Sequence, residues 1–431
     1  MNRKPLSNFA AIAVLTLIFF TWGGLTSLND VLIPHLKAVF EMNYARSMLI
    51  QSTFFGAYFL MSLPSGAVVA RAGYKGSIAI GLVVAAVGAA LFYPAAALPS
   101  YPLFLGALFV LASGLTLLQV AANPYIGLLG DPAGAASRMN LAQALNSLGT
   151  TLFPWLIGPL ILSTAVLGAS EIASMDIAGQ LAYRAQQAQS VQVPYLLLGG
   201  GLLLLAVFVL AMRLPTLRDA SLPAETPHGF AEVLRHRHLR WGVVAIFVYV
   251  GAEVAIGSFL INYLSGPTTG GLTEAVASRY LAFYWGGAMV GRFAGAALLQ
   301  RVDARRLLAL FAVAAAVLLA TTMSTRDQLA MWSVIAIGLF NSIMFPTIFA
   351  IAIERLGPLT SKASSLLVMA IVGGAVVPWV QGWLADRIGI QHAFVVPLAC
   401  YAFIVWYAVR GSRAAASARG AVSVQPAEPL G

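Results

Sequence analysis

The chain has 431 residues, of which 60% are hydrophobic and only 9% charged, and its formal net charge is +10. Soluble domains carry about 25% charged residues, so this composition excludes a soluble globule and indicates an all-α integral membrane protein. The single cysteine, Cys400, excludes a disulfide framework and a CxxC metal site, and no metal and no cofactor are expected.

Apolar runs of about 20 residues, long enough to cross the hydrocarbon core of a bilayer, recur twelve times along the chain. The first run, 9–36, lacks a small-residue cleavage site after a short apolar core, so we expect a retained helix rather than a signal peptide. The other spans are expected at 45–69, 76–97, 102–128, 139–163 and 194–212, and then at 241–264, 278–299, 307–323, 329–353, 361–384 and 392–409.

The basic residues between these spans predict the orientation, because cytoplasmic loops are rich in Lys and Arg. With the amino terminus in the cytoplasm, 18 of the 25 basic residues fall on the cytoplasmic side and six on the other, while Arg292 alone lies within a span. We therefore expect a multi-pass protein with both termini cytoplasmic. The positive charge is a topology signal and does not indicate nucleic acid. Arginine outnumbers lysine 21 to 4 beside abundant alanine, which favours a bacterial inner (plasma) membrane.

The second half of the chain repeats features of the first. Segment 54–75 matches segment 283–305 in the spacing of glycine and basic residues, and PWLIGPL at 154–160 recurs as PWVQGWL at 378–384. Chance matching of Gly/Ala/Leu-rich sequence is the alternative, but secondary carriers are commonly built from such repeated halves. We predict two pseudo-symmetric six-helix bundles. The expected organisation is an N-terminal bundle 1–212, a cytoplasmic linker 213–240, a C-terminal bundle 241–410 and a disordered cytoplasmic tail 411–431.

Five blocks of the chain carry a more specific signature. They are SLNDVLIPHLK (27–37), GYKGSIAIGL (73–82), LQVAANPY (118–125), RMNLAQALNSLGT (138–150) and FPTIFAIAIERLG (345–357). These blocks resemble the major facilitator superfamily, and within it the fucose/glucose/galactose–proton symporter family. The resemblance runs from about residue 15 to 410 and implies the major facilitator fold of twelve transmembrane helices.

The loop after the second span keeps only part of the pattern that is usual in that superfamily. Arg71 and Lys75 survive with Gly66 and Gly73, but Ala70 replaces the aspartate. We expect Arg71 and Lys75 to have a conformational or structural role.

The first span carries two polar residues, Asn29 and Asp30, where hydrocarbon would otherwise surround the helix. A charge in mid-membrane costs roughly 2.5–3.5 kcal/mol on insertion scales, so such residues usually face a cavity and serve a function. A carboxyl group that is charged when wetted and neutral when occluded can carry one proton per cycle. In the resembled family, the aspartate of the Asn-Asp pair is the implicated proton site. The alternative is a hydrated carboxylate at the outer end of the helix, near Pro34, His35 and Lys37.

Glu253 is the second acid that lies clearly within a span. It could be a second proton or cation site, or it could accept a hydrogen bond from a sugar. Equally, it could form a structural pair with Arg292 of the eighth span, which would then be a conformational ion-pair partner. The residue pattern leaves both interpretations open.

Uncharged polar residues of spans one, four, five and ten suit a sugar, whose hydroxyl groups need donors and acceptors at several angles. Each residue alone would more often be a helix–helix contact, but their helical spacing and concentration favour a cavity. Aromatic rings could stack on the C–H faces of a sugar, although lipid-facing positions are their default. The predicted substrate-binding residues are Asn29, Gln119, Asn123, Gln143, Asn146, Asn341, Trp22 and Trp379.

One departure from the resembled family narrows the substrate. Gln119 stands where the fucose branch carries a glutamate, so this region looks like the glucose/galactose and N-acetylglucosamine branches. We expect a monomeric secondary active transporter in contact with membrane lipid. It would import glucose, galactose or N-acetylglucosamine by cation symport and alternating access, with protons as the coupling ion and sodium as the alternative.

Two other transport functions fit parts of the sequence. L-Fucose–proton symport is one alternative. An antiporter that exports a sugar, drug or metabolite is another, although the hydrophilic fifth span disfavours it. An enzyme is not expected, because the chain contains neither an HExxH motif nor a P-loop.

Overall fold

The structure is a computed structural model that describes residues 7–39, 44–98, 100–161, 174–189, 191–215, 230–266, 269, 271–272 and 274–413. Within these ranges it does not describe the side chains of 29–39, 44–48, 51, 154–155, 157–161, 181, 184–185, 187–188, 274–275 and 278. The first half contains α1 (Asn8–Val39), α2 (Tyr44–Ala97), α3 (Tyr101–Leu128), η1 (Pro132–Gly134), α4 (Ala135–Ile161), α6 (Ile177–Gln189) and α7 (Gln192–Ala211). The second half contains α8 (Phe230–Val233), α9 (Arg237–Leu264), α10 (Glu274–Leu298), α11 (Ala304–Ser324), α12 (Asp327–Asn341), α13 (Met344–Ala352), η3 (Gly357–Leu359), α14 (Thr360–Met369), η4 (Ala370–Val372), α15 (Gly373–Ile388), α16 (Ile390–Ala393), α17 (Val395–Trp406) and η5 (Tyr407–Gly411).

The number of membrane spans agrees with the sequence. Nine helical runs among the described residues are long and apolar enough to cross a membrane. One of them, Ser52–Ala97, comprises two expected spans that meet at Gly73, whose φ of 68° is open mainly to glycine. The remaining two expected spans are α4 and α10, whose polar residues lower their hydropathy. The twelve-helix prediction is confirmed.

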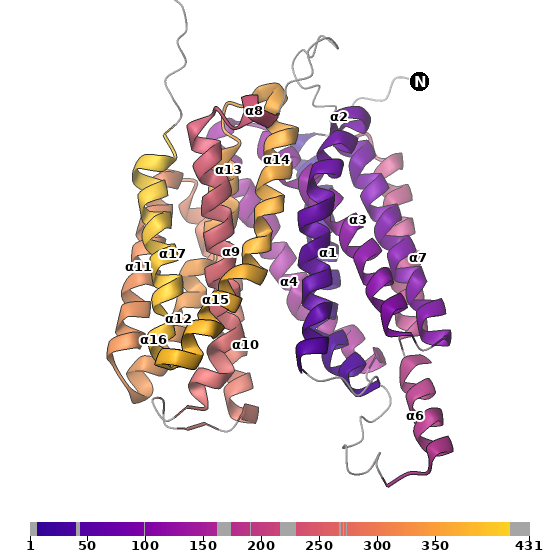
Figure 1. The fold of residues 1–431 in the computed structure, drawn as a ribbon. Helices are drawn as coiled ribbons and strands as arrows, with labels where there is room; N and C mark the ends of the chain where they lie inside the picture. Colours follow the sequence, from indigo (N-terminus) through magenta and orange to yellow (C-terminus); the bar gives the residue numbers. More distant parts are fainter. Residues whose placement is uncertain are drawn as a thin grey trace, which may run out of the picture.

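Figure 1 shows the two halves of the chain as two bundles that lie side by side. In the first bundle α2 packs on α3 and α7, and α1 packs on α4; in the second, α9 packs on α13, α15 and α17. The bundles touch mainly through α4 with α10 and through α2 with α14. Their ribbons lie close at the end that carries the amino terminus and diverge toward the opposite end.

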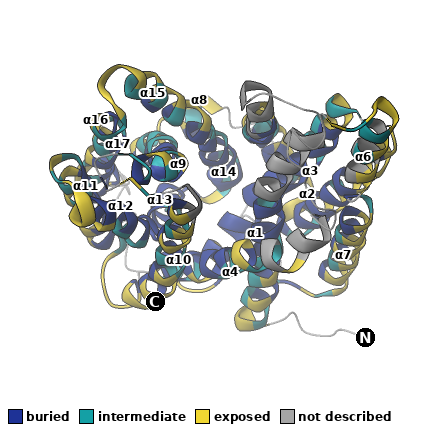
Figure 2. Cartoon of the chain, turned by 90° about the horizontal axis from the view of Figure 1, so that it is seen from below, coloured by how far each residue is buried: buried dark blue, intermediate teal, exposed yellow. Residues whose placement is uncertain are grey.

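The exposed surface of the bundles is apolar where the membrane would lie. On α7, the side chains of Leu197 and Leu204 are 67% and 73% exposed. Figure 2 shows exposed residues along the outer edges of both bundles and buried ones between the helices. A helix that leaves leucines uncovered is expected in hydrocarbon, because lipid tails are as apolar as the side chains themselves.

Spans ten and eleven differ from the continuous helices that the sequence predicts. Span ten is interrupted between α12 and α13, and span eleven passes through the 3₁₀ turn η4 between α14 and α15. Pro346 explains part of this difference: it has no N–H to donate to the Ser342 carbonyl four residues earlier, so that acceptor is left for another partner. Interrupted helices are tolerated in membranes where a neighbour satisfies the freed group.

The predicted linker and tail can be compared with the bounds of the observed helices. Helix α9 begins at Arg237, three residues before the expected end of the linker, and the linker also contains α8. Residues 216–229 of the linker and 414–431 of the predicted disordered tail lie outside the described residues.

Close backbone contact between α1 and α4 depends on glycine. A Cβ atom at Gly149 would lie 2.0 Å from the Phe20 carbonyl oxygen, and one at Gly23 would lie 2.0 Å from the Asn146 carbonyl oxygen. Small residues let membrane helices approach in this way. The contact holds the polar face of α4 in register with α1.

We expect Gly149→Leu to prevent stable packing of α1 on α4, because overpacking a tight contact typically costs about 1–3 kcal/mol or more. The variant should show a broadened size-exclusion peak and a lower melting temperature in detergent. Gly200→Leu is the matched control, since a Cβ at Gly200 meets no atom within 4 Å. Equal melting temperatures for the two variants would contradict this prediction, because they would show that a leucine side chain fits between α1 and α4.

Candidate functional site

A network of tyrosines surrounds Asn341 inside the second bundle. The Asn341 side-chain amide donates to the Tyr284 hydroxyl (2.9 Å), and its Oδ1 accepts from the Tyr401 hydroxyl (2.7 Å). The Tyr249 hydroxyl donates to the Asn341 backbone carbonyl (3.0 Å). All four residues are buried. The network joins α9, α10, α12 and α17. Both polar atoms of the Asn341 side-chain amide are therefore bonded to tyrosines of the protein, whereas the sequence predicted that this residue binds the substrate.

Arg292 of α10 connects the network to the first bundle. Its Nη2 lies 3.8 Å from Glu253 Oε1 on α9, and both side chains are about nine-tenths buried, at 14% and 13% exposed. Its Nε donates to the Ser342 carbonyl (3.3 Å), the acceptor that Pro346 leaves unpaired. Its Nη1 donates to the Ser147 hydroxyl on α4, across the boundary between the bundles.

The Glu253 carboxylate is only partly satisfied by this arrangement. The Tyr249 side chain approaches the carboxylate, but within the described residues its buried Oε1 has no hydrogen-bond donor. The distance of 3.8 Å to Arg292 is longer than the roughly 2.7–2.9 Å of a charge-assisted hydrogen bond. The structure thus brings together the acid and the arginine that the sequence proposed as partners. Whether Glu253 also exchanges a proton stays a prediction.

In the first bundle, Gln119 and Trp22 meet at a tyrosine. The Gln119 side-chain amide donates to the Tyr58 hydroxyl (2.7 Å), and the Trp22 side chain approaches the same hydroxyl. Gln119, Tyr58 and Trp22 are 5%, 2% and 6% exposed. Three helices, α1, α2 and α3, therefore contribute polar and aromatic groups at one buried place.

The polar residues of α4 and α3 are buried, or half-buried in the case of Asn146, and they make different contacts. The Asn146 side-chain amide donates to the Phe19 carbonyl (2.8 Å), and this bond fixes α4 on α1. Gln143 is 6% exposed, and its backbone carbonyl accepts from the Ser147 hydroxyl (3.0 Å). Asn123 of α3 is fully buried, and neither atom of its amide has a protein partner among the described residues.

Several predicted residues lie outside this assembly or outside the described side chains. Asn29 and Asp30 belong to α1, but their side chains are not described, so the proton site predicted there stays a prediction. Trp379 is 72% exposed on α15, on the side away from the buried Val377 and Gln381. Its substrate role therefore has no support from its surroundings.

The two basic residues of the partial loop motif differ from each other. The Lys75 ammonium donates to the Leu210 carbonyl (2.8 Å), which ties the loop to the end of α7. Arg71 is exposed. Lys75 therefore has a structural contact, while the role of Arg71 stays a prediction.

Serines join the bundles near the end that carries the amino terminus. The Ser361 hydroxyl donates to the Gly66 carbonyl (3.1 Å), the Ser364 hydroxyl to the Val120 carbonyl (2.9 Å) and the Ser137 hydroxyl to the Ala296 carbonyl (2.7 Å). The Val120 carbonyl is available because Pro124, four residues later, has no N–H. The contacts of these serines and of Ser147 were not predicted from the sequence. For the Ser364 contact the sequence does contain a signal, because Pro124 leaves the Val120 carbonyl without its helical donor.

Two other kinds of site receive little support. An apolar groove of about 580 Å³ lies between α1, α4 and α7, but Thr21 is the single polar side chain among its lining residues, so it does not suit a sugar. Among the described residues, no cluster of three His, Cys, Asp or Glu side chains could hold a metal ion.

Comparison with known proteins gives one family and closely related transporters. The model of the Major Facilitator Superfamily matches residues 14–370. A glucose/galactose transporter of Brucella abortus is 52% identical over 403 residues, 94% of each chain, and the L-fucose-proton symporter of Escherichia coli is 35% identical over 93% of each. A crystal structure of the transporter FucP in the outward conformation superposes with a TM-score of 0.87 at 34% identity, covering 94% of this chain and 99% of the other.

Proposed function

Because the chain belongs to the major facilitator superfamily of membrane transporters, we propose that it imports a hexose of the glucose/galactose class together with protons. The observation that carries this proposal is the group of buried, neutral polar side chains on α2, α3 and α4 of the first bundle. Gln119 and Tyr58 present hydroxyl and amide groups from the first bundle, and α4 adds Gln143. A hexose needs such neutral donors and acceptors in several directions.

The relatives support the substrate class. The protein at 52% identity is named a glucose/galactose transporter, whereas the fucose-proton symporter is 35% identical. At position 119 this chain has a glutamine, whose neutral amide is held by the Tyr58 hydroxyl. We therefore place fucose second and include N-acetylglucosamine among the candidate sugars.

Alternating access follows from the way in which the bundles touch. The serine contacts Ser361–Gly66 and Ser364–Val120 join them near the end that carries the amino terminus. The distribution of basic residues favours a cytoplasmic location for that end. On this orientation the transporter is closed toward the cytoplasm, and the sugar would reach α4 and α3 from outside. Breaking these few neutral hydrogen bonds, each worth about 1 kcal/mol, would allow the bundles to rock.

Proton coupling is assigned to Asp30, with Glu253 as the second acid. Uptake of a proton neutralises a carboxylate and so removes the cost of occluding a charge between the bundles. A carrier that closes readily only when its acid is protonated transports sugar and proton together. The fucose-proton symporter among the relatives supports protons over sodium as the coupling ion.

The test is uptake by the purified full-length chain in liposomes, with pH and sodium gradients imposed separately. We expect labelled galactose or glucose to accumulate when the inside is alkaline, and to do so without a sodium gradient. Unlabelled glucose and galactose should compete more strongly than fucose, and protein-free liposomes give the background. Accumulation that follows the sodium gradient alone would contradict proton coupling, and competition by fucose alone would contradict the substrate class.

A further inference from the structure

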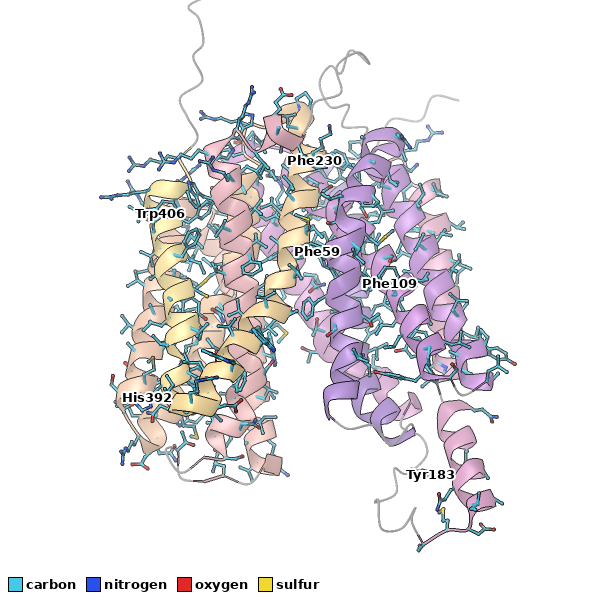
Figure 3. The ribbon with its side chains drawn as sticks, viewed as in Figure 1. Phe59, Phe109, Tyr183, Phe230, His392 and Trp406 are labelled. Atoms are coloured by element: carbon cyan, nitrogen blue, oxygen red, sulfur yellow. The ribbon has the colours of Figure 1, made fainter. Side chains whose placement is uncertain are left out.

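The second bundle carries exposed arginines around one of its ends. At this end α9 and α11 begin and the π-helical turn η5 closes the last span, and η5 packs against both helices. Figure 3 shows nitrogen-bearing side chains gathered there, beside the labelled Trp406. We call the exposed residues the arginine ring: they are Arg237, Arg240, Arg301, Arg306, Arg410 and Arg413.

The acidic residues at this end are engaged with other groups. The Asp303 carboxylate accepts hydrogen bonds from the backbone N–H groups of Arg305 and Arg306, both at 3.1 Å, and so caps α11. The Glu354 carboxylate pairs with the Arg305 guanidinium and lies 3.5 Å from that of Arg355. Within the described part of the chain, no ion pair joins an acid to the side chains of the arginine ring. No acid among the described residues therefore neutralises its positive charge.

The corresponding end of the first bundle differs. There, the Arg138 guanidinium donates to the carbonyls of Ile126 (3.2 Å), Gly127 (2.7 Å) and Asp131 (2.9 Å), and Lys75 donates to the Leu210 carbonyl. These basic groups serve the protein's own backbone. Arg138 and Lys75 thus differ from the arginine ring, although Arg71 of the first bundle is also exposed.

An aromatic cluster lies directly beside the arginine ring. The Trp241 ring packs edge-on against Trp406 (5.0 Å between centroids), and Phe403 completes the cluster 5.3 Å from Trp406. The Arg240 guanidinium lies 5.6 Å from the Trp241 ring centroid. Tryptophans concentrate at the headgroup level of membranes. The arginines next to them are therefore at the height of lipid phosphates.

We propose that the arginine ring binds the headgroups of anionic phospholipids. Guanidinium groups match phosphate oxygens in charge and in hydrogen-bond geometry, and basic residues beside membrane helices attract anionic lipid at the cytoplasmic leaflet. Trp241 and Trp406 favour a lipid over a free anion, since they would contact the glycerol and upper acyl region while Arg240 and Arg410 contact the phosphate. The proposal requires only that the chain is inserted in a membrane, and it does not depend on which solute is transported.

The test is native mass spectrometry of the full-length chain released from detergent with equal amounts of phosphatidylglycerol and phosphatidylcholine. We expect the chain to retain phosphatidylglycerol preferentially. The double variant Arg240→Gln/Arg410→Gln should lower that preference about thirtyfold, since each of the two basic residues near an anionic surface contributes about 1 kcal/mol. The matched control is Arg279→Gln/Arg326→Gln, which removes two exposed arginines from the opposite end of the same bundle.

Each outcome decides the proposal. A preference that falls in the first double variant and persists in the control supports it. An equal fall in both variants would show a general effect of net charge and would overturn a defined site. Displacement of the retained lipid by millimolar inorganic phosphate would show a free-anion site instead. Melting temperatures of both variants, measured in the same detergent, verify that each is folded.

Discussion

Asp30→Asn is expected to abolish concentrative uptake while leaving counterflow exchange of sugar at least partly intact. The asparagine is permanently neutral, so the bundles can still close over the sugar, but no proton is bound on one side and released on the other. Accumulation in liposomes with an alkaline interior should fall to the level of passive equilibration. Exchange of labelled for unlabelled sugar, with no gradient imposed, should continue because it needs only closure and reopening.

The matched control for this variant is Asp386→Asn, which makes the same chemical change at an exposed residue near the end of α15. It should accumulate sugar as the parent does. If Asp30→Asn fails to bind sugar at all, Asp30 is a ligand or a structural residue. If it accumulates sugar undiminished, the proton is carried elsewhere, and Glu253 becomes the first candidate.

Arg292→Gln is expected to destabilise the second bundle strongly. Removing one partner of a buried pair leaves the other charge uncompensated, which typically costs about 3–5 kcal/mol. Here the remaining charge would be Glu253, whose Oε1 already lacks a hydrogen-bond donor among the described residues. The variant would also lose the bonds to the Ser342 carbonyl and the Ser147 hydroxyl. We expect a clearly lower melting temperature in detergent and little transport.

The double variant Glu253→Gln/Arg292→Gln separates the two roles that the sequence left open for Glu253. It removes both charges, so much of the lost stability should return. If Glu253 is only a structural partner, the stabilised double variant should keep the pH dependence of uptake. Loss of that dependence in a folded protein would assign Glu253 a proton.

Ser147→Ala provides the matched control for the cross-bundle bond. It removes the acceptor on α4 and keeps the pair of Glu253 with Arg292, so stability should fall by about 1.5–3 kcal/mol, the usual contribution of a hydrogen bond to a charged group. A loss of stability as large as that of Arg292→Gln would show that Arg292 stabilises the fold chiefly through the contact between the bundles and not through its charge beside Glu253.

The twelve apolar runs, the internal repeat and the five sequence blocks that include LQVAANPY were enough to predict the fold and the transporter family. Each is a local property of the chain: a span of about 20 apolar residues is readable without knowing its neighbours, because every backbone polar group in lipid must be satisfied within its own helix. The neutral Gln119 was also readable as a departure from a fucose carrier. Asp30 and Glu253 stood out because acids are rare within membrane spans.

The partners of these residues could be decided only by the tertiary structure. Proline at 346 signals a free carbonyl at Ser342, but which cation reaches it depends on how α10 packs beside α12. Asn341 was readable as polar, yet its three tyrosines come from helices that are far apart in sequence. The reason is physical: in hydrocarbon a polar side chain is satisfied by whatever group lies across the helix interface, and interhelical distances are absent from a linear pattern.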